Sequence, residues 1–129
     1  MRSLARESVF KYLYSRLFNH TDEGLFDVLI KDLSVEDREF AKVLLSGVTD
    51  NQDKYLGIIE ELSIGFKLNR IINLDKCALL IGLAEFELFK DTPVPVVIDE
   101  AVKLSAKYST EKSVDFVNGI LGEYVRKNG

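Results

Sequence analysis

Eight consecutive apolar residues, from Cys77 to Ala84, constrain the fold of this 129-residue chain more than any other feature. A helix at a protein surface shows a polar side chain about once per turn, and this run shows none. The run is too short to cross a bilayer, which requires roughly 20 apolar residues. Because strong helix formers flank it, we predict a helix over residues 74–89 that is buried on nearly all sides. Asn73 is its predicted N-cap, and Asp75 falls in its first turn.

Apolar residues at helical spacing predict that the other helices surround this one. The expected ranges are 3–18, 23–33, 35–62, a single turn near 66–72, 96–108 and 111–127. Ser34, with Asp37 three residues later, is a predicted helix start, and the Asp50-Asn51 pair offers a point at which the long third helix can break. The expected fold class is all-α, with about seven helices in one domain over residues 1–129.

The net charge of −4 is distributed unevenly along the chain. Residues 1–20 carry four basic side chains against one acidic, residues 21–64 carry four against eleven, and residues 65–129 are balanced. A basic first helix permits binding of a polyanion on one face, although charged helix faces are usually just solvated.

The inventory of catalytic side chains is almost empty. The sequence has no glycine-rich phosphate loop, no paired CxxC and no nucleophile elbow. One cysteine (Cys77) and one histidine (His20) cannot build a usual zinc site. We therefore predict a protein that is not an enzyme and holds no metal. A lone cysteine in an apolar run and a first segment unlike a signal peptide favour a reducing, cytoplasmic location without a membrane span.

Motifs in three places resemble one known family. They are Ala-Arg-Glu at 5–7 followed by Tyr-Leu-Tyr at 12–14; the central segment 75–86; and Pro95 to Ser105 followed by Phe-Val-Asn-Gly-Ile-Leu at 116–121. In this order and spacing they resemble the NusB family of bacterial transcription antitermination factors, over essentially the whole chain. The closing Phe-Val-Asn-Gly segment, with Asp-Glu-Ala-Val upstream, is the most specific part.

The resemblance implies a fold of two small helical bundles without a cofactor. It also implies binding of boxA, a single-stranded element of nascent RNA, together with NusE, a ribosomal protein of the small subunit. The pair joins RNA polymerase and other Nus factors and suppresses termination, notably in ribosomal RNA operons. Both monomers and homodimers are consistent with it.

Family positions that face RNA or NusE can be carried onto this chain. The residues expected at RNA are Arg2, Arg6, Lys11, Lys112, Ser113, Phe116 and Asn118, and those expected at NusE are Tyr14 and Asp75. Phe116 also fits the apolar stripe of the last helix, so a core position is the competing interpretation.

The chain departs from the family pattern at several positions. It opens with two separated arginines rather than a cluster, and Leu80 and Ala84 stand where the family often has Arg and Tyr. These departures motivate an alternative hypothesis, a helical protein-interaction or dimerisation module with weak or lost RNA binding. A third hypothesis, an accessory domain like those that precede RNA cytosine methyltransferases, would place catalysis outside this chain.

Overall fold

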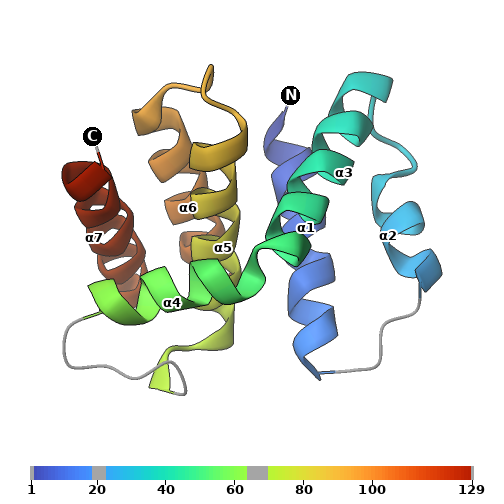
Figure 1. Cartoon of the computed structure of the whole chain (residues 1–129). Helices are drawn as coiled ribbons and strands as arrows, with labels where there is room; N and C mark the ends of the chain where they lie inside the picture. Colours follow the sequence, from blue (N-terminus) through green and yellow to red (C-terminus); the bar gives the residue numbers. More distant parts are fainter. Residues whose placement is uncertain (1, 19–22, 64–69, 129) are drawn as a thin grey trace.

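The computed structural model describes residues 2–18, 23–63 and 70–128, and these form seven helices and no strand (Figure 1). The helices are α1 (Arg2–Phe18), α2 (Glu23–Ile30), α3 (Val35–Asp50), α4 (Gln52–Leu62), α5 (Asn73–Leu88), α6 (Val94–Tyr108) and α7 (Glu111–Asn128). The all-α class predicted from the sequence is therefore confirmed.

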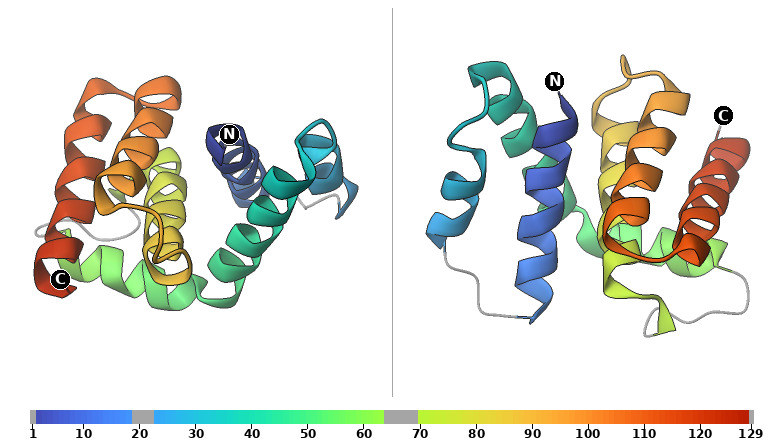
Figure 2. Two further views of the ribbon diagram at one scale, coloured as in Figure 1. Left: turned by 90° about the horizontal axis from the view of Figure 1, so that it is seen from above. Right: turned by 180° about the vertical axis from the view of Figure 1, so that it is seen from behind.

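The helices form two groups that share one core. α1, α2 and α3 make the first group, and α4 lies across α5, α6 and α7 in the second (Figures 1 and 2). α1 also packs against α5 and α6, so it belongs to both groups. Buried apolar residues from all seven helices form one continuous cluster.

α5 is the central helix that the apolar run predicts. Every residue from Cys77 to Glu85 is buried. The predicted N-cap at Asn73 is wrong, because the helix begins one residue earlier and Ile72 occupies the cap position. The Ile72 carbonyl accepts hydrogen bonds from the N–H groups of Asp75 (2.9 Å) and Lys76 (3.0 Å), without a side-chain cap.

The predicted long helix over 35–62 is divided at the point where a break was expected. Asn51 has φ −121°, and both its backbone N–H and its Nδ2 donate to the Gly47 carbonyl, at 3.1 and 3.0 Å. α3 therefore ends at Asp50, and α4 starts in a new direction. The Ser34 cap is confirmed, since its side chain accepts from the N–H of Asp37 at 3.1 Å.

Other differences from the predicted elements are small. α2 ends at Ile30 rather than at residue 33. The single turn predicted near 66–72 and the loop that contains His20 lie mainly outside the described residues. The described residues form seven helices, and the predicted helix over 35–62 accounts for two of them, α3 and α4. Among the described helices, none combines the length and apolar character needed to span a bilayer.

Candidate functional site

A largely apolar pocket of about 450 Å³ lies where α5 and α7 both begin. It is lined by Arg70, Ile71, Ile72, Asp75, Thr110, Lys112, Ser113 and Phe116. Four of these, namely Asp75, Lys112, Ser113 and Phe116, are residues that the sequence predicts to contact RNA or NusE. The fold thus brings predicted residues that are some 40 positions apart into one pocket.

The start of α7 is fixed by hydroxyl side chains. The N–H of Ser113 donates to the carbonyl of Thr110 (3.0 Å) and lies 3.3 Å from its Oγ1. This places Thr110 as a side-chain cap of the helix. The cap directs the first turn of α7 towards α5 and sets Lys112 and Ser113 at the pocket.

A chain of hydroxyls leads to a buried carboxylate in the pocket wall. Ser113 Oγ donates to Asp75 Oδ2 at 2.9 Å. Because its one proton is used there, the 2.7 Å contact between Ser109 Oγ and Ser113 Oγ has Ser109 as donor. These bonds link the beginning of α5 to the beginning of α7.

Burial of the Asp75 side chain costs folding free energy, because a carboxylate is removed from water. It is 4% exposed, and its Oδ1 has no hydrogen-bond partner. Burial raises the pKa of the Asp75 carboxyl, while the hydroxyls of Ser113, Ser109 and Ser105 lower it. A buried carboxylate oxygen without a donor costs free energy, because no hydrogen bond replaces its lost hydration.

The rim of the pocket is basic and its wall is aromatic. Arg70 and Lys112 are exposed, and Phe116 is half-buried. The two interpretations of Phe116 therefore both hold in part, since the ring packs against the core and also lines the pocket. Asn118, two residues beyond Phe116 and therefore on another face of α7, is exposed and does not line the pocket.

The predicted residues of α1 lie in different environments. Arg2 is exposed, and its guanidinium stands 4.5 Å from the centre of the Phe40 ring. Lys11 is exposed and lies 3.8 Å from Glu7, while Tyr14 is half-buried. These side chains are spread along the helix rather than gathered in one cluster.

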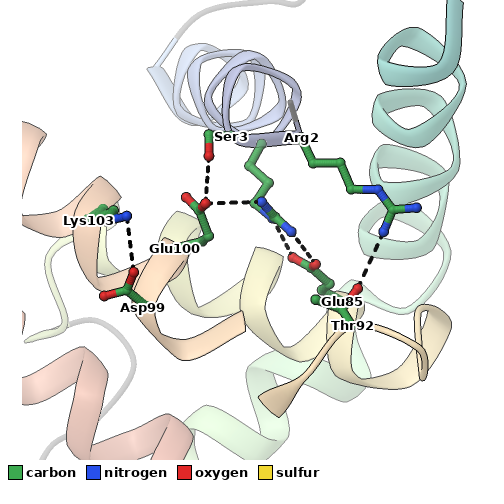
Figure 3. A network of polar contacts seen from close by, with 8 residues as sticks. Arg2, Ser3, Glu85, Thr92, Asp99, Glu100 and Lys103 are labelled. Carbon is green, nitrogen blue, oxygen red and sulfur yellow. Dashed lines mark hydrogen bonds and ion pairs between the residues drawn. The ribbon is translucent and has the colours of Figure 1, made fainter. Parts of the chain in front are cut away.

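Arg6 is buried and ion-paired rather than free at the surface. It is 4% exposed, and its Nε and Nη2 donate to both carboxylate oxygens of Glu85 at 2.7 and 2.6 Å. Its Nη1 lies 3.4 Å from Glu100. Figure 3 shows this network, in which Ser3 also donates to Glu100 at 2.5 Å. Sequence reasoning did not identify Glu85 and Glu100 as partners.

The predicted functional residues therefore lie in two separate places, one near the beginning of α5 and one near its end. Asp75 and Glu85 are ten residues apart on α5, which corresponds to about 15 Å along the helix axis. The pocket with Asp75 lies at the beginning of α5, whereas Arg6 pairs with Glu85 near the end of that helix. Among the described residues, no group of three or more His, Cys, Asp or Glu side chains is placed to hold a metal ion.

Fold and pocket together define a class of small helical proteins that offer a basic-rimmed pocket at the meeting point of two helix starts. The NusB family model matches residues 3–126, and the chain belongs to the NusB family.

Relatives and solved structures agree with this assignment. The chain is 35% identical to the transcription antitermination protein NusB of Alkaliphilus oremlandii, across 99% of this chain and 95% of that protein. A structure of NusB from T. maritima superposes with a TM-score of 0.90 at 28% identity, covering 98% of this chain and 92% of that one. A chain from a crystal structure of the antitermination factors NusB and NusE in complex with dsRNA gives a TM-score of 0.83 at 27% identity, covering 98% and 96%.

Proposed function

We propose that this protein is a transcription antitermination factor that binds boxA-type single-stranded RNA together with NusE and joins them to the RNA polymerase assembly. The observation that carries the proposal is the convergence of Asp75, Lys112, Ser113 and Phe116 on one pocket. Binding of NusE and of RNA as such is also supported by a solved relative, similar over nearly the whole chain, that was crystallised with NusE and dsRNA.

The pocket has the chemistry that a single strand requires. Phosphates are held by basic side chains, and bases stack on aromatic rings. Lys112 and Arg70 supply positive charge at the rim, and Phe116 supplies a partly exposed ring. The exposed side chains Asn118, Lys11 and Arg2 belong to the same proposed RNA surface. Ser113 is 2% exposed, so its proposed role is to hold Asp75 in the pocket wall.

The proposed NusE contact uses Asp75 and Tyr14. Asp75 lines the pocket, but its carboxylate is buried, so a cationic or N–H group of the partner would reach the oxygen without a donor only after the pocket wall shifts. RNA and NusE would then share one composite surface, and the protein acts as an adaptor rather than as an enzyme. In this role it works in the cytoplasm, where nascent transcripts are made.

Fluorescence anisotropy of labelled boxA RNA tests the proposal, with and without NusE and at several salt concentrations. We expect affinity that falls steeply with salt, because phosphate contacts release counterions, and that rises when NusE is added. Lys112→Gln should weaken binding about 3- to 10-fold and reduce the salt slope by about 0.7. Lys127→Gln, an exposed lysine at the other end of α7, is the matched control and should bind like the parent.

The protein-interaction module remains the alternative, and the apolar lining of the pocket is the observation that favours it. The affinity of an apolar protein interface depends little on salt concentration, whereas affinity that comes from phosphate contacts falls as salt is added. A NusE complex that forms normally while boxA RNA fails to bind at any salt concentration would replace the proposed function with this alternative.

A further inference from the structure

The environment of Arg6 is incompatible with a role as a phosphate ligand. Three of its nitrogens already face carboxylates, two on Glu85 and one on Glu100. Glu85 is 1% exposed and Arg6 is 4% exposed. A phosphate approaching this guanidinium would have to enter a closed site and meet two negative charges.

The Arg6 side chain also lies where four helices meet. It comes from α1, pairs with Glu85 of α5 and Glu100 of α6, and stands 5.3 Å from the centre of the Phe40 ring of α3. These contacts join the first helix group to the second. A bidentate arginine–carboxylate pair fixes the orientation of both partners, because its two parallel bonds allow little rotation.

The position of α1 matters for the proposed interface. α1 carries Arg2, Lys11 and Tyr14, whereas α5 and α7 carry the pocket residues. The α1 residues and the pocket residues can contact one RNA–NusE assembly only if α1 keeps a fixed height and rotation relative to α5. The Arg6–Glu85 pair is a buried directional contact that fixes this height and rotation.

We infer that Arg6 is a positioning residue, which holds α1 in register with α5 and α6 and does not itself contact RNA. The inference rests on the proposed function, because the interface it aligns is the proposed RNA and NusE surface. It reassigns a residue that the family resemblance places at the RNA.

Paired substitutions test the inference. Arg6→Met leaves Glu85 buried without a partner, so the urea midpoint should fall and boxA affinity should fall about 5-fold or more. Arg6→Met combined with Glu85→Met replaces the pair by apolar side chains of similar length. This double variant should recover both the midpoint and the affinity, with the salt slope of the parent. Arg2→Gln, in which an exposed arginine is lost, should instead reduce the salt slope by about 0.7 and lower the midpoint only slightly, by the exposed cation–π contact with Phe40.

A recovered midpoint with affinity still low and a reduced salt slope would show that Arg6 contacts phosphate, and would overturn the inference. Labelling the parent with phenylglyoxal gives a second test that needs no variant to fold. Arg6 should be protected with and without RNA, whereas Arg2 should react freely without RNA. Equal reactivity of the two arginines in the free protein would also overturn the inference. If the parent protein binds no boxA RNA, the proposed function is wrong. The labelling result then decides by itself whether the Arg6 guanidinium is shielded in its ion pair.

Discussion

At the scale of single residues, the same side-chain type has opposite roles in this protein. Arg2 and Arg6 are one turn apart and both lie near Phe40, yet one is exposed and the other is buried. The difference depends on Glu85, which is 79 positions away in the sequence. Charge counting along the chain treats the two arginines as equivalent, and only their tertiary partners separate them.

Asp75 gives a prediction at the same scale. Its folded-state pKa is raised by burial, so any stabilisation it gives is present below the ordinary value of 3.8 and is lost as pH rises through the folded pKa. At neutral pH the buried charge costs stability, and Asp75→Asn should remove that cost. We expect the variant to be more stable by about 1 kcal/mol at pH 7, measured by urea unfolding.

The gain should shrink as the pH is lowered towards 4, because the parent carboxyl then becomes neutral as well. NusE binding should weaken in the same variant if Asp75 is the partner contact. A variant less stable than the parent at pH 7, or a gain that does not depend on pH, would contradict this assignment.

At the scale of helices, the close packing of α5 leaves little room for added atoms. A Cβ at Gly82 would lie 2.9 Å from Leu121 Cδ1 and 3.6 Å from the Ala101 Cβ. Leu121 is fully buried and cannot move aside easily. Gly57 of α4, by contrast, is exposed and has no atoms within 4 Å of such a Cβ.

Two alanine substitutions should therefore have opposite effects. Gly82→Ala should destabilise the protein by about 1–3 kcal/mol, because overpacking forces buried neighbours to shift. Gly57→Ala should stabilise it by about 0.5–1 kcal/mol, because alanine favours the helix and meets no obstacle. Thermal unfolding of both variants and of the parent gives the sign of each change in stability. A Gly82→Ala variant more stable than the parent would show that α5 packs loosely against Leu121 and Ala101.

Most of the helices could be predicted from the sequence, because burial imposes a local pattern on each of them. The apolar run of α5 and the cap at Ser34 are such local signals. The helix boundaries were harder to predict, as the error at Asn73 shows. A helix that begins without a side-chain cap has no capping residue by which the sequence could indicate its first turn. The pocket at Asp75 and Ser113 required helices distant in the chain to be placed together, and the family resemblance suggested the two residues only as parts of separate contacts, Asp75 with NusE and Ser113 with RNA.

At the scale of the whole molecule, two helix groups share one continuous core. α1 contributes Val9 and Phe10 to that core and also pairs through Arg6 with the second group. Neither group can lose α1 without exposing apolar surface and an unpaired carboxylate.

We therefore expect the protein to unfold as one cooperative unit. Helix content by circular dichroism and tyrosine fluorescence should report the same urea midpoint, as two-state unfolding requires. Single substitutions in either group should move both signals together. Two separated transitions would show that the groups are independent and that the contact through α1 is weak.

The pairing of Arg6 with Glu85 also has a consequence for the order in which the chain is completed on the ribosome. α1 leaves the ribosome early, but its buried partner is added 79 residues later. At roughly 5–20 residues per second, this delay lasts about 4–16 s. During that interval α2 and α3 can pack on α1, but the arginine remains hydrated and the face of α1 that packs on α5 and α6 stays open to solvent.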